Sequence, residues 1–180
     1  MSMEHHLNLP VNPDDIQKLH IGDVLYISGS IFTARDEAHH MMLEKENIPF
    51  NPAEMGLYHC GPLMKKTQKE WQVVSAGPTT SSRMEIFEDH FIKKYDVKII
   101  IGKGGMGPRT QTALKKHTAV YVAYTGGAGA LAADKITQVP AVYWLDELGM
   151  PEAVWIFTVK EFGPLIVAMD SHGESIYPRD

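Results

Sequence analysis

The sequence has little cysteine, and long apolar runs and blocks of basic residues are missing from it. Cys60 is the single cysteine among 180 residues, which excludes a disulfide within the chain and favours a reducing, cytoplasmic setting. Apolar stretches are short and interrupted, so we expect no membrane span. The first residues lack the basic flank and apolar segment of a signal peptide. Lysine and arginine number 17 against 22 acidic residues and form no run, so we expect no nucleic-acid partner.

Apolar, β-rich segments alternate with helical segments along the chain. The candidate strands are 23–28, 57–60, 71–76, 97–101, 119–124, 141–145, 154–159 and 165–169. The central ones show little polar alternation, which is typical of strands covered on both faces. We therefore predict an α/β fold, in which residues 21–180 form a single domain with a mixed, mostly parallel central sheet. Residues 1–20 are interpreted as an irregular N-terminal arm.

Capping patterns mark the candidate helices. The sequences T-A-R-D from Thr33 and S-R-M-E from Ser82 both fit a capping-box start. Pro108 suits the first turn of a helix that ends in basic residues. A fourth helix is expected over residues 129–135. The last two candidate strands have no helix between them, so part of the sheet is expected to be antiparallel.

Three polar loops each follow a candidate strand and precede a candidate helix, which is where α/β proteins bind ligands. The loops span residues 28–36, 75–84 and 101–109, and each contributes one cation, namely Arg35, Arg83 and Lys103. Helix N-termini add N–H donors and partial positive charge. Together these groups can hold a small ligand with two carboxylates, because arginine binds a carboxylate in a bidentate manner and lysine acts as a point charge.

Each of these residues also has a purely structural interpretation. Arg35 can pair with a surface carboxylate such as Glu37, and Arg83 can be an exposed first-turn residue. Thr79 and the threonine after it belong to a type that is common in turns and caps. Lys103 is harder to explain structurally, because it lies between two glycines.

The glycine-rich loops leave a dinucleotide site open as an alternative. A G-x-G-x-x-G pattern begins at Gly102, but no acidic residue lies near twenty positions further on, where the ribose partner is expected. A G-x-G-x-x-A pattern begins at Gly127, and Asp146 ends the next candidate strand. On pattern alone, a nucleotide-binding oxidoreductase is therefore a second function class.

Thiol or metal chemistry has weak support in the sequence. Cys60 could be a nucleophile or a metal ligand, but a buried thiol at a strand end is the commoner case. His39 and His40 are adjacent on a candidate helix, so their side chains point to different sides. The motifs H-E-x-x-H and C-x-x-C do not occur in the sequence, and we expect no metal site.

Around these loops the sequence strongly resembles the C-terminal domain, or separate β subunit, of class I fumarases and the related L-tartrate dehydratases. The resemblance is carried by GDVLYISGSIFTARDEAHH, YHCGP, SAGPTTSSRM, IGKGGM, AYTGGAGALAA and AVYWLDELGMPEAVW. These segments cover nearly the whole chain, from Gly22 to Glu174. The resemblance implies a swivelling β/β/α domain, and it explains the glycine-rich loop at Gly127 without a nucleotide.

The resemblance also implies a division of labour between two subunits. A partner α subunit would hold a [4Fe-4S] cluster through three cysteines, and α₂β₂ is the implied assembly. The single cysteine agrees, because a cubane cluster needs several thiolates. By position, Arg35, Arg83 and Lys103 match the family's substrate-binding cations. Thr79 matches the threonine proposed as the base that removes the carbon-bound proton.

We therefore expect the β subunit of a [4Fe-4S]-dependent hydro-lyase that interconverts fumarate and malate. This chain would supply the cations and the base. An alkanol such as that of Thr79 is a poor base unless nearby positive charge stabilises the alkoxide, which the three cations can do. Dehydration of L-tartrate is the alternative within the same class. A non-catalytic docking or regulatory module of the α subunit is an alternative of a different class.

Overall fold

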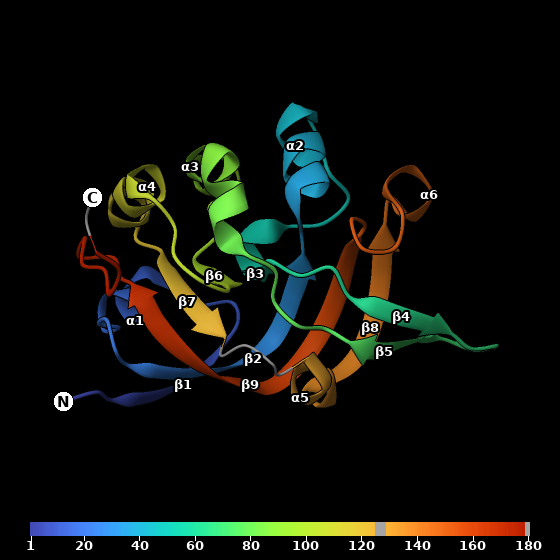
Figure 1. The fold of residues 1–180 in the computed structure, drawn as a ribbon, viewed down its shortest axis with the longest axis horizontal. Coiled ribbons are helices and arrows are strands. Elements are labelled where there is room, and N and C mark those ends of the chain that lie inside the picture. Colours follow the sequence, from blue (N-terminus) through green and yellow to red (C-terminus); the bar gives the residue numbers. More distant parts are fainter. Residues whose placement is uncertain (125–128, 179–180) are drawn as a thin grey trace.

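The computed structural model describes residues 1–124 and 129–178 (Figure 1). Its strands are β1 (Glu4–Asn8), β2 (Val24–Thr33), β3 (Gly56–Tyr58), β4 (Leu63–Lys66), β5 (Trp71–Ser75), β6 (Ile99–Gly102), β7 (Val120–Tyr124), β8 (Ile136–Tyr143) and β9 (Val154–Met169). Its helices are α1 (Pro13–Gln17), α2 (Asp36–Glu44), α3 (Glu85–Tyr95), α4 (Pro108–His117), α5 (Gly129–Asp134) and α6 (Leu145–Leu148), with 3₁₀ turns η1 (Pro52–Glu54) and η2 (Ser81–Met84).

Seven strands form one mixed sheet in the order β1-β2-β3-β6-β7-β9-β8, and β4 and β5 form a separate hairpin. The pairs β1–β2, β2–β3, β3–β6 and β6–β7 are parallel. β9 runs antiparallel to β2, β7 and β8. Because β9 pairs with both β2 and β7, the sheet closes partly into a barrel. The mixed sheet is confirmed, but a mostly parallel one is not. The swivelling movement remains a prediction.

The two candidate strands 154–159 and 165–169 are parts of one strand, the 16-residue β9. The expectation that part of the sheet is antiparallel is confirmed, because β9 pairs in that direction with β2 and β8. The sequence suggested a break because glycine and proline stand at 163 and 164. The chain passes this point with irregularities instead: Glu161 has a positive φ of 50°, and the pairing with β2 shifts register. Such bulges let one strand bend and serve several partners.

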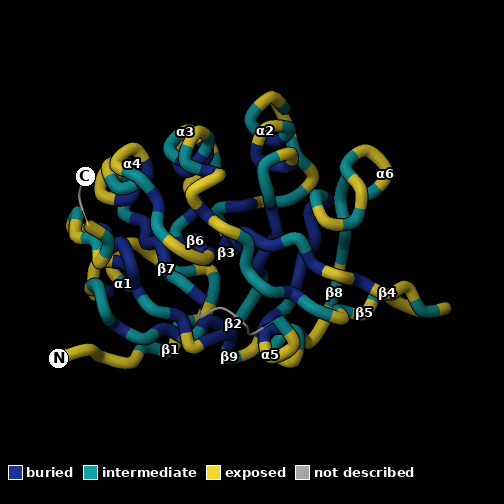
Figure 2. Tube along the Cα trace, in the orientation of Figure 1, coloured by how far each residue is buried: buried dark blue, intermediate teal, exposed yellow. Residues whose placement is uncertain are grey.

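The central strands are covered on both faces, as the sequence predicted. Ile99 and Ile101 point into one hydrophobic core, whereas Ile100 between them points into the other. Tyr121 of the adjacent β7 joins the same core as Ile100. The second core lies under α2, α3 and α4, which cover one face of the sheet (Figure 1). Figure 2 shows the resulting buried strands between more exposed helices.

Residues 1–20 are more regular than the arm that the sequence analysis expected. β1 pairs in parallel with β2 along five residues, from Glu4↔Val24 to Asn8↔Ser28. The Asn12 side chain caps α1 through a reciprocal capping box with Asp15. Ile16 then lies fully buried in the core. Apolar residues in this segment therefore join it to the sheet, and a division of the chain at residue 20 remains a prediction.

Two expected helix starts differ from the structure. Thr33 is the last residue of β2 rather than a cap, because its hydroxyl donates to the Ala153 carbonyl and accepts from the Trp155 N–H. A 3₁₀ turn from Ser81 precedes α3. The start of α4 at Pro108 is confirmed. The glycine pattern at Gly127 begins outside the described residues.

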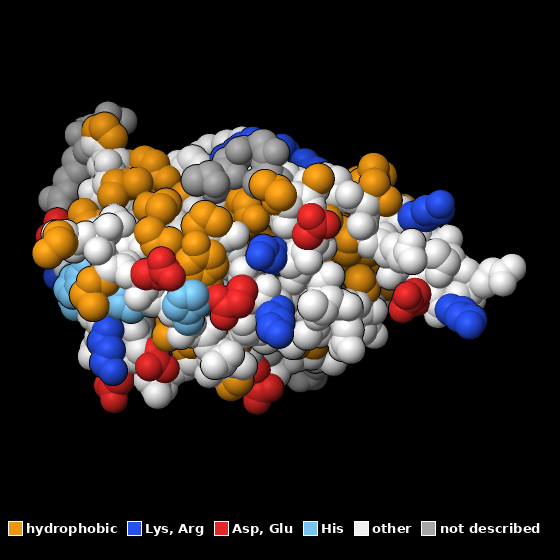
Figure 3. Space-filling view, turned by 90° about the horizontal axis from the view of Figure 1, so that it is seen from below, with side chains coloured by type: hydrophobic (Ala, Val, Ile, Leu, Met, Phe, Trp, Pro, Cys, Tyr) orange, Lys and Arg blue, Asp and Glu red, His pale blue; other side chains and the backbone are white. Residues whose placement is uncertain are grey.

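The charged side chains of the face in Figure 3 are interspersed. Lys and Arg side chains there are separated by acidic, apolar and uncharged ones.

Among the described residues, no helix is long and apolar enough to cross a membrane.

Candidate functional site

Three parallel strands end at the same edge of the sheet. β2, β3 and β6 are neighbours with matched directions. Arg35, His59 and Lys103 follow their carboxyl ends by one or two residues. The carboxyl edge is where α/β sheets bind ligands. Two of the three predicted cations therefore follow the strands that flank β3 at this edge.

The loop that carries Thr79 and Arg83 is bonded directly to the Lys103 loop. Thr80 and Lys103 form an isolated parallel β-bridge. The Ser81 N–H donates to the Lys103 carbonyl at 3.0 Å, and the Lys103 N–H donates to Ser81 Oγ at 3.1 Å. The second and third predicted loops are therefore one unit at this edge.

Arg83 connects that unit to the first loop. Its Nη2 lies 3.2 Å from Asp36 Oδ2, and its side chain is 51% exposed. Asp36 is the residue after Arg35 and opens α2. Both arginines therefore lie at the start of α2, with the Arg83 guanidinium still open to solvent.

Arg35 is held by a different carboxylate from the one suggested by its neighbours in the sequence. Arg35 Nε lies 3.3 Å from Glu152 Oε1, and Glu152 also accepts the Glu37 N–H. The side chain packs over Gly61, where a Cβ would come within 2.8 Å of Arg35 Cδ. The Y-H-C-G-P glycine therefore gives the guanidinium room at the edge.

Thr79 is half-buried. Its N–H donates to the His59 carbonyl at 2.8 Å, which ties the loop to the end of β3. The next threonine, Thr80, is the N-cap of η2 but makes no side-chain capping hydrogen bond. Thr80 is therefore a cap residue by position without the capping hydrogen bond, and a catalytic role of Thr79 remains a prediction.

Beneath this edge lies a buried cluster of His39, His59 and Glu88. All three side chains are fully buried. Glu88 Oε2 lies 2.8 Å from His39 Nε2 and 3.4 Å from His59 Nε2, at ion-pair distance but without linear hydrogen-bond geometry. On their other sides, His39 Nδ1 lies 2.8 Å from the Arg35 carbonyl and His59 Nδ1 lies 2.8 Å from Ser81 Oγ.

The charges of this cluster depend on one another. Burial by itself would raise the pKa of Glu88, but attraction to His39 and His59 outweighs burial and lowers that pKa to about 2. Burial opposes a charge on His39 too, yet the Glu88 carboxylate raises its pKa above the ordinary value. Burial prevails at His59, whose pKa is lowered. The cluster therefore favours an ionised Glu88, a charged His39 and a neutral His59.

No sequence motif predicts this cluster. Its members come from α2, the end of β3 and α3, with no short motif spacing among them. Their ligand atoms lie within 4.8 Å of one another, a spacing that a metal ion could also use. The sequence contains only indirect signals of these residues. A histidine before Cys60 and a glutamate on the inner side of α3 both lie among apolar neighbours.

Cys60 is a buried thiol, as the commoner interpretation predicted. It is fully buried in the core, and burial raises the pKa of its thiol. A thiol held in the protonated form is a poor nucleophile and a poor metal ligand. One such thiol does not fit the ligand set of a cubane cluster.

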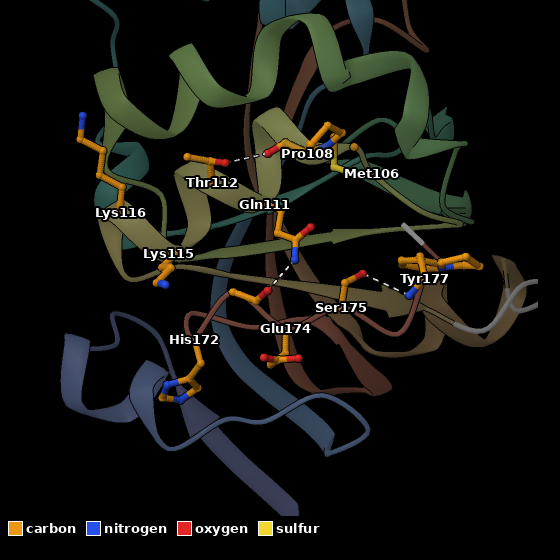
Figure 4. A pocket seen from close by; sticks show the side chains of 13 residues that line it. Met106, Pro108, Gln111, Thr112, Lys115, Lys116, His172, Glu174, Ser175 and Tyr177 are labelled. Atoms are coloured by element: carbon orange, nitrogen blue, oxygen red, sulfur yellow. Dashed lines mark hydrogen bonds between the residues drawn. The ribbon is translucent and has the colours of Figure 1, made fainter. Parts of the chain in front are cut away.

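A separate hollow of about 1020 Å³ lies between α4 and the C-terminal segment (Figure 4). Gln111 and Lys115 line it from one side, and His172 and Tyr177 line it from the other. The Tyr177 hydroxyl donates to the Gly104 carbonyl at 2.7 Å. This hollow therefore backs the Lys103 loop, but it contains none of the four predicted site residues.

Known proteins resemble this chain over nearly its whole length. The family described as "Fumarase C-terminus" matches residues 2–179. The "Putative L(+)-tartrate dehydratase subunit beta" of Methanocaldococcus jannaschii is 49% identical over 97% of this chain and 91% of its own length. The "L(+)-tartrate dehydratase subunit beta" of Escherichia coli is 43% identical over 97% of this chain and 87% of its own length.

A longer relative contains the same unit. The "Putative fumarate hydratase class I" of Geobacillus stearothermophilus is 42% identical over 95% of this chain, which corresponds to 33% of that protein. The family match, the length of the aligned regions and the identity all agree with the resemblance found in the loops. The chain belongs to the Fumarase C-terminus family.

Proposed function

We propose that this chain is the β subunit of a hydro-lyase that adds water to, or removes it from, a four-carbon dicarboxylate. Fumarate and malate are the first candidate pair. The observation that carries the proposal is the convergence of the three cation loops. Ser81 and Lys103 are joined by two hydrogen bonds, and Arg83 pairs with Asp36 beside Arg35.

The residues at this edge have complementary roles in the proposal. Arg35, Arg83 and Lys103 bind and orient the two carboxylates of the substrate. Thr79 takes the proton from carbon in dehydration and returns it in hydration. The same three cations stabilise the alkoxide form that a threonine base requires. Ion pairs with Glu152 and Asp36 restrict the side chains of Arg35 and Arg83, which lowers the entropic cost of aligning them on a substrate.

The [4Fe-4S] cluster belongs, in this proposal, to a partner α subunit in an α₂β₂ assembly in the cytoplasm. The donor set of this chain supports that assignment, because its single thiol is buried and protonated. An exposed Arg83 and an exposed Lys103 also suit a site that is completed by a second chain.

Dehydration of L-tartrate is the second candidate function. It is favoured by the names of the M. jannaschii and E. coli relatives, each of which is called a subunit beta and aligns with this chain over most of its own length. Both substrates present two carboxylates on four carbons, so the three cations fit either one.

Co-expression with a candidate α subunit, anaerobic reconstitution and parallel assays on malate and tartrate test the proposal. The complex should turn over one of the two acids. The isolated chain should be folded, colourless and inactive; turnover by the pure chain would contradict the two-subunit proposal. If combined alanine substitutions of Arg35, Arg83 and Lys103 leave turnover unchanged, the chain is a docking module instead.

A further inference from the structure

The buried His39–Glu88–His59 cluster contacts every segment of the proposed site. The Arg35 carbonyl accepts hydrogen bonds from the His39 backbone N–H at 3.0 Å and from His39 Nδ1 at 2.8 Å. The His59 carbonyl accepts the Thr79 N–H at 2.8 Å. A fully buried ionisable cluster is costly unless its charges compensate, so its position beneath the Arg35, Thr79 and Lys103 segments calls for a physical explanation.

The proton positions follow from the partners of each imidazole. The Arg35 carbonyl can only accept, so His39 Nδ1 carries a hydrogen, and a second hydrogen on Nε2 faces the Glu88 carboxylate. Ser81 Oγ accepts the Lys103 N–H and has its own hydrogen to donate to His59 Nδ1. His59 Nε2–H then faces the same carboxylate oxygen. One imidazolium, one carboxylate and one neutral imidazole give no net charge.

A bound metal ion explains the cluster less well. A structural zinc site needs four ligands, whereas the group found among the described residues has three. All three are fully buried, which leaves no solvent-facing position for a water ligand. The 2.8 Å separation of His39 Nε2 and Glu88 Oε2 is that of an ion pair, and the Glu88 carboxylate raises the pKa of His39.

We propose that Glu88, His39 and His59 are positioning residues that hold the Arg35, Thr79 and Lys103 segments in register with one another. The Glu88 carboxylate fixes the positions of the His39 and His59 imidazoles. His39 then fixes the backbone of Arg35, and His59 fixes Ser81 and through it the backbone of Lys103. The catalytic consequence rests on the proposed hydro-lyase function, whereas the arrangement of the loops does not.

The matched substitutions come from two histidine–carboxylate pairs that share α2. Glu88→Gln removes the buried charge that faces His39. Glu44→Gln makes the same chemical change at the exposed pair His40–Glu44, whose atoms lie 3.3 Å apart. His39→Gln and His40→Gln form a second matched pair, which keeps the test valid where Glu88→Gln fails to fold.

Nitrogen-15 NMR of the full chain measures the protonation of the imidazole nitrogens in the cluster, without substrate or partner. We expect two protonated ring nitrogens on His39 and one on His59 in the wild-type chain. In the Glu88→Gln and His39→Gln chains, the backbone amide signals of Arg35, Thr79 and Lys103 should shift, and the control variants should leave them in place. Unshifted amides in folded Glu88→Gln and His39→Gln chains would overturn the proposal. So would one equivalent of tightly bound zinc that is lost in these variants.

Kinetics of the reconstituted complex test the consequence for catalysis. Glu88→Gln should lower kcat/KM on the order of 10²-fold at a temperature where the variant is fully folded, since a displacement of about 1 Å costs that much. Glu44→Gln should match the wild type. Wild-type kinetics in the Glu88→Gln complex would overturn the positioning role. A wild-type complex that acts on neither acid would refute the proposed function, and the amide shifts would still decide whether the cluster holds the loops.

Discussion

Ser81 and Lys103 hold each other through two hydrogen bonds, one from the Ser81 N–H to the Lys103 carbonyl and one from the Lys103 N–H to Ser81 Oγ. The packing around the hydroxyl is tight, because a Cβ on Gly102 would lie 1.8 Å from Ser81 Oγ. The serine is fully buried. The hydrogen bond to this hydroxyl therefore fixes the backbone of the G-K-G-G loop at Lys103.

Ser81→Ala should loosen that loop, because it removes the hydroxyl and keeps only the Ser81 N–H bond to the Lys103 carbonyl. The Lys103 N–H and His59 Nδ1 lose their shared partner, so we expect the free energy of unfolding to fall by about 1–3 kcal/mol. KM for the dicarboxylate should rise more than kcat falls, because a binding cation becomes less well placed. Urea unfolding and steady-state kinetics measure the two effects; an unchanged KM would show that the hydroxyl only supports the fold.

Arg83→Ala should impair catalysis far more than stability. The Arg83 side chain is 51% exposed, and its ion pair with Asp36 contributes little to folding. A bidentate, charge-assisted contact with substrate is worth enough that we expect kcat/KM to fall on the order of 10²–10³-fold. Arg83→Lys should restore only part of the loss.

The control for Arg83 is Arg109→Ala. Arg109 is 48% exposed and pairs with Asp89, so it matches Arg83 in exposure and partner type. It should keep wild-type kcat/KM in the reconstituted complex. Equal losses in the two variants would show that Arg83 has no special contact with substrate.

Cys60→Ser should leave cluster assembly with the α subunit intact. The thiol is fully buried, and burial raises its pKa, so the side chain packs rather than coordinates. Placing a hydroxyl in that position should cost about 1–2 kcal/mol of stability. Visible absorbance of the reconstituted complex and thermal unfolding give the readout, and a loss of cluster absorbance would identify Cys60 as a ligand.

The stability that Glu88 contributes should depend on pH within a defined window. Its pKa is about 2 in the folded chain against an ordinary 4.5, so the unfolded chain binds more protons in that interval and stability is lost as the pH falls from 4.5. The contribution of His39 to stability changes with pH in the opposite direction. Its pKa is raised above 6.5, so this contribution is complete below pH 6.5 and is lost as the pH rises through the pKa of the folded chain.

The wild type should therefore exceed Glu88→Gln in unfolding free energy most clearly between pH 4.5 and 6.5, the ordinary values of the two groups. Urea titrations of both chains from pH 3 to 9, with Glu44→Gln as the exposed control, measure this difference. A difference that does not change with pH would show that Glu88 is not ionised in the folded chain. The lowered pKa of His59 acts against stability in acid in the wild type.

Local patterns were sufficient to place the three cations near strand ends but not to predict what lies beneath them, and residues 28–33 of the first predicted loop belong to β2. Short motifs identify Arg35, Arg83 and Lys103, because each follows a strand and precedes a helix. His39, His59 and Glu88 meet only after α2 and α3 have packed on the sheet, and no spacing in the sequence encodes that meeting. The sequence predicted two strands in place of β9, because Gly163 and Pro164 are local signals of a turn. Long-range pairing with β2 overrides these signals.

Thr79 should matter for proton transfer rather than for binding. Its backbone is fixed by the hydrogen bond to the His59 carbonyl at 2.8 Å, so replacing the side chain should leave the loop in place. Thr79→Val keeps the shape and removes the oxygen. If that oxygen moves the proton, kcat should fall by roughly 10²–10⁴-fold while KM changes little. Thr79→Ser should keep substantial activity, because it retains the oxygen.

Exchange of solvent deuterium into malate separates the chemical step from the rest of turnover, since it follows the carbon-bound proton alone. The valine variant should lose this exchange together with kcat, and the serine variant should keep most of it. A threonine that merely supports the turn would give a different result: both variants would lose about 0.5–2 kcal/mol of stability or less and would catalyse normally once folded. Exchange at the wild-type rate in Thr79→Val would exclude Thr79 as the base and leave Thr80 or a residue of the α subunit to take the proton.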